Sequence, residues 1–146
     1  MRLCIIGGFY ANFAAYFNSG MLLTDFFTIK DFSINDNTGT VSVKINPEHK
    51  VFVGHFPGRP VVPGVFTLQM IKECVEVVLN RKFRYSELVN CKFSNVILPD
   101  KMPYLQIEYA VKEAEENIRL DAVVKSGDIT ALILKAVLTD ATSAKE

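Results

Sequence analysis

The stretch from residue 64 to residue 79, GVFTLQMIKECVEVVL, constrains the fold more than any other part of the sequence. Its apolar residues cover most of the circumference of a helix rather than one stripe. A helix with so little polar surface must be covered by other elements on most of its sides. The sequence therefore predicts a largely buried helix over 64–79, whose charged residues are Lys72, Glu73 and Glu76.

Segments in which apolar and polar residues alternate surround this helix and predict β-strands. Two precede it, joined by the turn signal NDNTG, and a Pro/Gly-rich loop over roughly 46–63 leads from them into the helix. The last predicted strand is apolar on both faces, so we expect it to be central in the sheet or covered at a subunit interface. The predicted strands are 24–34, 40–46, 88–98, 104–112, 118–125 and 129–139.

This order of elements predicts an α+β architecture, in which one long buried helix packs against a curved antiparallel sheet of about six strands. That geometry is the hotdog fold. The length of 146 residues fits one domain. We expect residues 1–20 to be an N-terminal extension outside the fold, because glycine and asparagine interrupt their apolar region and they are too short to span a bilayer. Residues 21–146 would then form the single domain.

Charge and cysteine content exclude several classes of function. Sixteen basic residues balance sixteen acidic ones, so no overall field selects nucleic acid or an anionic membrane. The three cysteines, Cys4, Cys74 and Cys91, are widely spaced, and we expect buried, reduced thiols in a cytoplasmic protein. Two histidines and scattered thiols make no recognisable metal-ligand set, and no nucleotide or flavin motif is present, so no metal or cofactor is expected.

The loop before the helix carries candidate catalytic groups. His55 lies between Gly54 and the run FPG, where proline restricts the backbone and glycine widens its choices. The N–H of Gly64 belongs to the unpaired first turn of the helix and could polarise a carbonyl oxygen. An imidazole near neutrality could remove the proton alpha to that carbonyl. Two of the three parts of a β-elimination are therefore present, although a lone histidine in a tight loop more often braces the loop.

The run GHFPGRPVVPGV, residues 54–65, resembles the signature of the 3-hydroxyacyl-[acyl-carrier-protein] dehydratases of fatty-acid synthesis, which have the hotdog fold. The similarity extends from about residue 22 to 140. It implies that His55 is the catalytic histidine and that the N–H of Gly64 binds the thioester carbonyl. It also implies a homodimer, or an assembly of such dimers, with an acyl tunnel at each interface. The further substrate-binding residues that it implies are Phe56, Pro63 and Val65.

The sequence departs from this family at Gln69. Five residues after the glycine, the family carries a Glu or Asp that acts from the opposite subunit as the acid for the departing hydroxyl. A carboxamide can donate a hydrogen bond but cannot deliver a proton, and the loss of a positioned general acid costs ~10² to 10⁴ in rate. Glu73 lies one turn further on the same face and is either a substitute acid or a solvated or paired carboxylate. His49, the other histidine, is expected to be an exposed loop residue.

Three functions remain open at this point. The first is a dehydratase in which His55 moves the alpha proton and Gln69 orients the hydroxyl. The second is a non-catalytic subunit that binds acyl thioesters, or one half of a mixed dimer whose partner supplies the missing carboxylate. The third and least favoured is a thioesterase that uses Glu73 to activate water, because the HFPG loop is not typical of that group.

The expected partner is an acyl carrier protein that bears a phosphopantetheine-linked acyl chain. Because such carriers are acidic, we expect a basic contact, and Arg59 in the motif is the first candidate. A second basic group follows the helix and is either a further carrier contact or a set of ordinary solvated cations; it comprises Arg81, Lys82 and Arg84.

Overall fold

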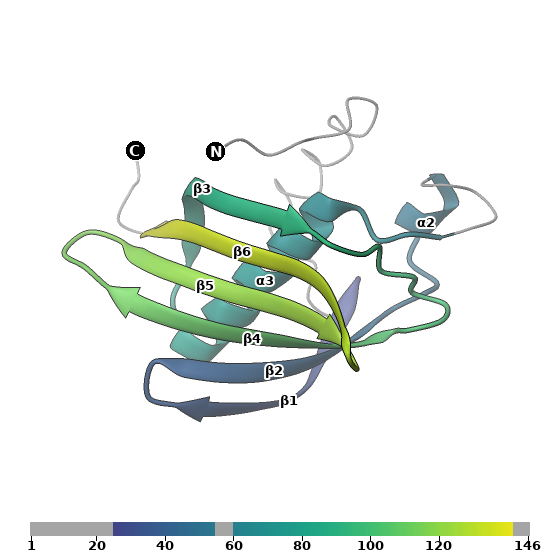
Figure 1. Ribbon diagram of the computed structural model, residues 1–146, viewed down its shortest axis with the longest axis horizontal. Helices are drawn as coiled ribbons and strands as arrows, with labels where there is room; N and C mark the ends of the chain where they lie inside the picture. The colour runs from purple at the N-terminus through teal and green to yellow at the C-terminus, as the bar shows by residue number, and fades with distance from the viewer. Residues whose placement is uncertain (1–24, 55–59, 142–146) are drawn as a thin grey trace.

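The computed structural model describes residues 25–54 and 60–141, in which six antiparallel strands form one curved sheet with a long helix against its inner face (Figure 1). The predicted extension over residues 1–20 lies outside the described residues. The elements are β1 (Phe27–Asn35), β2 (Thr38–Ile45), α2 (Val51–Gly54), α3 (Gly64–Leu79), β3 (Phe83–Phe93), β4 (Tyr104–Glu113), β5 (Ile118–Ser126) and β6 (Ile129–Asp140).

The strand order in the sheet is β1-β2-β4-β5-β6-β3. β4, β5 and β6 follow one another as a meander, and the turn between β5 and β6 holds Gly127 at a φ of 60°, a conformation that glycine adopts without steric cost. α3 connects β2 to β3 and passes across the inner face of the sheet, so that β1 and β3 become the two edges (Figure 1).

α3 begins and ends where the sequence predicts, at Gly64 and Leu79. Asn80 ends it in the left-handed conformation, and the N–H of Asn80 donates to the carbonyl oxygen of Glu76. The helix packs its apolar surface against the inner face of the sheet, and this layer is the hydrophobic core. Fully buried core residues include Met70, Ile71, Cys74, Val75, Val41, Ile107, Leu120 and Leu132.

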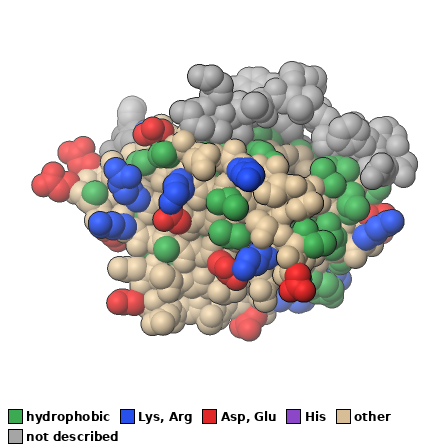
Figure 2. Space-filling model, viewed as in Figure 1, with side chains coloured by type: hydrophobic (Ala, Val, Ile, Leu, Met, Phe, Trp, Pro, Cys, Tyr) green, Lys and Arg blue, Asp and Glu red, His purple; other side chains and the backbone are tan. Residues whose placement is uncertain are grey.

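β6 is an inner strand, between β5 and β3, as its apolar sequence predicts. Only its inner face is fully buried, since Ile133 on the outer face is 37% exposed. Figure 2 shows this outer face with basic, acidic and hydrophobic side chains interspersed. Ion pairs link neighbouring strands there, with Lys135 Nζ 3.3 Å from Asp121 Oδ1. This face therefore has no large area of a single charge.

β3 differs from its prediction. The sequence placed a strand over 88–98, whereas the structure has it over Phe83–Phe93, paired with β6 from Asp140 back to Leu132. Beyond Phe93 the chain leaves β6 and approaches the start of α3, where the carbonyl oxygen of Ile97 accepts a hydrogen bond from the N–H of Val62 at 2.9 Å. Within 94–98, Ile97 is buried at this contact, whereas Val96 is 56% exposed.

The region predicted as a loop over 46–63 contains the short helix α2, which the sequence did not indicate. α2 lies beside the N-terminal end of α3 (Figure 1). Within the described residues, neither helix combines the length and the apolar character needed to cross a lipid bilayer.

Candidate active site

The first turn of α3 presents two backbone donors. Pro63 precedes the helix in an extended conformation, and its carbonyl oxygen accepts hydrogen bonds from the N–H groups of Phe66 and Thr67 at 3.0 and 3.2 Å. The N–H groups of Gly64 and Val65 have no acceptor within the part of the chain that the structure describes. These groups lie at the positive end of a sixteen-residue helix, where a carbonyl oxygen or an oxyanion is stabilised.

Three of the predicted substrate-binding residues are together at this helix start. Pro63 and Val65 are buried, and Gly64 between them is partly exposed. The remaining predicted residues of the motif, His55, Phe56 and Arg59, lie outside the described residues. They are bounded in sequence by α2 on one side and by the start of α3 on the other.

Phe93, at the end of β3, packs its ring against Gly64. A Cβ atom at position 64 would lie 2.8 Å from Cζ and 3.0 Å from Cε1 of that ring. Gly64 is not among the described residues with positive φ, so the backbone conformation does not require glycine there, but a larger residue would have to displace the Phe93 ring. No sequence pattern indicates this contact, because it depends on how β3 and α3 pack.

Gln69 and Glu73 form a buried pair on α3. Gln69 is 6% exposed and Glu73 is 2% exposed, and Gln69 Nε2 donates a hydrogen bond of 2.6 Å to Glu73 Oε2. The sequence placed both residues on one face and left Glu73 as solvated, paired or catalytic; the structure shows it buried and paired. Because an ionised carboxylate only accepts hydrogen bonds, this contact turns the amide nitrogen of Gln69 toward Glu73 and leaves Oε1 and one N–H available.

The prediction that His49 is exposed was wrong. Its side chain is buried at 4% exposure, with the ring edge-on to Phe26 and Phe66 at centroid distances of 5.4 and 6.2 Å. His49 Nδ1 accepts a hydrogen bond from the N–H of Val51, and Nε2 lies 3.1 Å from Asp25 Oδ2. Burial lowers the pKa of His49 from 6.5, outweighing the nearby Asp25 carboxylate, which raises it. The sequence pattern NPEHK is polar and gave no sign of this burial.

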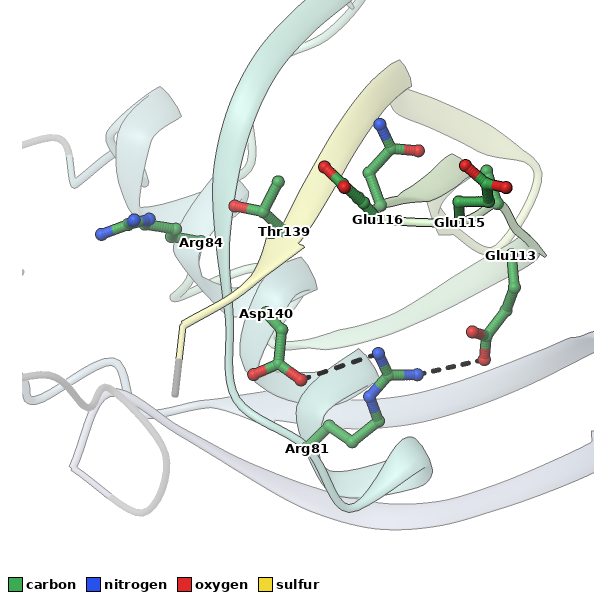
Figure 3. A pocket seen from close by; sticks show the side chains of 9 residues that line it. Arg81, Arg84, Glu113, Glu115, Glu116, Thr139 and Asp140 are labelled. Atoms are coloured by element: carbon green, nitrogen blue, oxygen red, sulfur yellow. Dashed lines mark hydrogen bonds and ion pairs between the residues drawn. The ribbon is translucent and has the colours of Figure 1, made fainter. Parts of the chain in front are cut away.

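The basic group after the helix lies at the other end of α3, about 24 Å from Gly64 at 1.5 Å per residue. Figure 3 shows Arg81 between two carboxylates, with Nη1 3.0 Å from Glu113 Oε2 and Nη2 3.8 Å from Asp140 Oδ2. These residues line a hollow of about 510 Å³ together with Arg84 and further glutamates. The surrounding carboxylates offset the positive charge, which favours the interpretation of Arg81 as a paired surface cation.

Known proteins resemble this chain in sequence and in structure. Residues 31–130 match the family model ApeI-like, described as ApeI dehydratase. The 3-hydroxyacyl-[acyl-carrier-protein] dehydratase FabZ of Fusobacterium nucleatum is 30% identical over 106 residues, which are 65% of this chain and 74% of that protein.

Two solved structures show the same fold. The dehydratase heterocomplex ApeI:P from Xenorhabdus doucetiae matches with a TM-score of 0.61 at 19% identity, over 76% of this chain and 96% of that one. A hypothetical thioesterase with coenzyme A from Streptococcus pneumoniae matches with a TM-score of 0.57 at 8% identity, over 78% of this chain and 84% of that one. At these identities the likeness concerns the fold alone. The predicted hotdog fold is confirmed.

Proposed function

The chain belongs to the ApeI-like dehydratase family, and on this premise we propose that it eliminates water from a 3-hydroxyacyl thioester carried by acyl carrier protein. The alpha proton would pass to His55, the beta hydroxyl would leave as water, and a trans-2-enoyl thioester would remain. The carrier-bound substrate is suggested by the name of the FabZ relative. We expect this reaction in the cytoplasm, with Cys74 as a reduced, buried thiol.

The observation that carries the proposal is the pair of available N–H groups at Gly64 and Val65. A thioester oxygen at this position would gain negative charge as the alpha proton leaves, and the helix start would stabilise that charge. Phe93 covers the Cα side of Gly64, which would keep water from competing for the same donors. Phe56, Pro63 and Val65 would line the path of the acyl-pantetheine arm, and Arg59 would contact the carrier protein.

Gln69 cannot serve the same substrate as Gly64 of its own helix. Five residues along an α-helix correspond to a rotation of about 140° and a rise of roughly 7.5 Å, so the two residues point in different directions. We propose that Gln69 faces the substrate of the opposite protomer in a homodimer or an assembly of dimers. With its nitrogen turned toward Glu73, it would orient the hydroxyl through Oε1 or the remaining N–H.

A second candidate function follows from the same residue. Gln69 occupies the position of the family acid, and it cannot protonate a departing hydroxyl. A relative in Xenorhabdus doucetiae is a dehydratase heterocomplex. The present chain could likewise pair with a related subunit that supplies the carboxylate, acting by itself only as an acyl-thioester-binding subunit. The thioesterase alternative is weaker, because Glu73 is already hydrogen-bonded to Gln69.

Turnover assays distinguish these candidates. The purified chain is incubated with 3-hydroxyacyl carrier proteins of several chain lengths, and the enoyl product is followed by mass spectrometry. We expect slow dehydration that Gln69→Glu accelerates by ~10² or more, the scale of a general acid, whereas Gln69→Asn does not. His55→Ala should abolish it. Absence of product from both the native chain and the Gln69→Glu variant would refute the homodimeric enzyme.

Purification from the native source tests the mixed dimer. A related subunit that co-purifies in equal amount and restores dehydration would support the mixed-dimer hypothesis. Recovery of the chain only as a homodimer would count against it. Release of free thiol from acyl-coenzyme A without enoyl formation would instead indicate a thioesterase.

A further inference from the structure

His49 connects the two elements that flank the HFPG motif. We propose that His49, in its neutral form, is a positioning residue that holds α2 against the first turn of α3 and so fixes the backbone next to His55. The functional part of this inference rests on the proposed dehydratase site. The contacts themselves are independent of it.

The contacts of His49 reach both elements. On one side, Nδ1 accepts a hydrogen bond of 3.0 Å from the N–H of Val51, the first residue of α2, and the carbonyl oxygen of His49 accepts another of 3.1 Å from Phe52. On the other side, the imidazole ring meets Phe66 in the first turn of α3, and both rings meet Phe26. His49 therefore contacts both α2 and the first turn of α3, and Phe52 of α2 adds a second contact by packing its ring against Phe26 at a centroid distance of 5.8 Å.

These contacts select one protonation state. Because Nδ1 accepts a hydrogen bond from Val51, the proton of the neutral ring is on Nε2, which donates to Asp25 Oδ2 at 3.1 Å. A second proton on Nδ1 would place a donor against the N–H of Val51 and break that bond. Among the charged groups near the ring, Asp25 raises the pKa of His49 and Lys50 lowers it, whereas Phe26 and Phe66 pack uncharged rings against it.

The consequence for the site follows from the sequence. α2 ends at Gly54, the residue directly before His55, and α3 begins at Gly64, whose N–H is the proposed carbonyl donor. When His49 becomes charged, the hydrogen bond from the N–H of Val51 to Nδ1 is lost, and the charged ring is favoured in a more solvent-exposed position. The backbone that enters the motif should then move relative to the helix that ends it.

The positioning role of His49 can be tested by NMR, because the chain has two histidines and their ring signals can be told apart. The full-length protein, labelled with ¹⁵N in histidine, is titrated from pH 8 to pH 5 while the ring signals of His49 and His55 are followed. We expect His49 to show the Nε2–H tautomer at pH 8 and a pKa below 6.5. We expect the His55 signals to show a second inflection at the pKa of His49.

Three variants assign that inflection. Asp25→Asn removes a charge that raises the pKa and should move the inflection to lower pH, whereas Lys50→Gln removes one that lowers it and should move it to higher pH. His49→Asn keeps an oxygen acceptor for Val51 but does not titrate, so the second inflection should vanish while the His55 titration remains. If His49→Asn does not fold, opposite shifts of the second inflection in Asp25→Asn and Lys50→Gln still assign that inflection to His49.

A charged His49 at pH 7, or a His55 titration curve that none of the variants changes, would overturn the positioning role. Failure of the proposed function is seen separately, because the titration needs no substrate. Coupled histidines without enoyl formation would leave the positioning of the motif intact and refute the dehydratase. Enoyl formation together with independent titration of the two histidines would support the dehydratase and refute the positioning role of His49.

Discussion

The amide nitrogen of Gln69 donates a hydrogen bond of 2.6 Å to the carboxylate of Glu73, and both side chains are buried on α3. The resemblance to the 3-hydroxyacyl-[acyl-carrier-protein] dehydratases implies an acid at the position of Gln69, and the carboxylate of Glu73 lies one helical turn further on. This hydrogen bond sets the direction in which the Gln69 amide points, and in the proposed site Gln69 would contribute hydrogen bonds to the substrate hydroxyl.

Glu73→Gln and Glu73→Ala should have different effects. The glutamine is isosteric and can still accept from Gln69 through its carbonyl oxygen, so we expect the free energy of unfolding to change by less than about 1 kcal/mol. The alanine leaves the buried amide of Gln69 without this acceptor, which costs about 1–3 kcal/mol. Urea denaturation measures both.

The same variants show whether Glu73 transfers a proton. If it only positions Gln69, Glu73→Gln should keep enoyl formation within tenfold of the native rate. A loss of ~10² or more with unchanged stability would mean that Glu73 is the acid.

Gly64→Ala should disturb the site more than the stability. The added Cβ would lie 2.8 Å from the Phe93 ring, which is half-exposed and can turn aside. Since alanine also favours the helix, we expect the free energy of unfolding to change by less than about 1 kcal/mol. Binding of an acyl-pantetheine probe, followed by calorimetry, should weaken. In a protein that also carries Phe93→Ala, Gly64→Ala should weaken binding of the probe less. If Gly64→Ala weakens binding equally with and without Phe93, the contact between the two residues does not explain the effect.

Glu76 should be a major source of stability where α3 meets β3. Its Oε2 accepts hydrogen bonds from Lys72 Nζ at 3.0 Å and from the N–H of Phe83 at 2.8 Å, all in partly or fully buried surroundings. Glu76→Ala leaves the N–H of Phe83 without this acceptor and the Lys72 ammonium without its carboxylate partner, although Lys72 Nζ still donates to the carbonyl oxygen of Phe83 at 3.0 Å. We therefore expect the free energy of unfolding to fall by about 3–5 kcal/mol. Glu108→Ala, on the outer face of the sheet, removes an exposed ion pair with Lys125 and should cost less than about 1 kcal/mol. If thermal or urea unfolding shows the same loss of unfolding free energy for Glu76→Ala and Glu108→Ala, Glu76 is not a major source of stability.

The stability of the native chain should fall as the pH drops below 6.5 through the titration of His49. The unfolded chain binds a proton at this histidine near pH 6.5, whereas the folded chain, with its lowered pKa, resists it. The unfolded state therefore takes up more protons, and the free energy of unfolding decreases by up to about 1.4 kcal/mol per pH unit toward acid.

The control for this pH dependence is His49→Asn, which retains His55 and every carboxylate. The difference in free energy of unfolding between the native chain and this variant, from urea curves between pH 5 and pH 8, isolates the contribution of His49. A difference that does not vary with pH would mean that His49 keeps an ordinary pKa in the folded protein.

Sequence patterns predicted the parts of the fold that have a local cause. The span of α3 followed from its apolar residues and its proline start, and both ends were confirmed. β4 and β5 followed from alternation, β6 from a run that is apolar on both faces, and the turn at Gly127 from its residue types. The predictions for β3 and His49 failed because tertiary contacts, rather than local composition, determined them: β3 pairs with β6 from Phe83 onward, and the His49 ring packs against Phe66 of α3.

By itself, the sequence determined the helix with its unpaired first turn, the strand alternation and the motif that begins at Gly54, since each depends on residues close together in the chain. It also placed Gln69 and Glu73 on one face, because the helical period is fixed. The burial of this face, the contact of Phe93 with Gly64 and the contacts of His49 with α2 and α3 depend instead on how distant segments pack. These contacts link residues far apart in sequence, and their geometry is set by how the sheet curves around the helix.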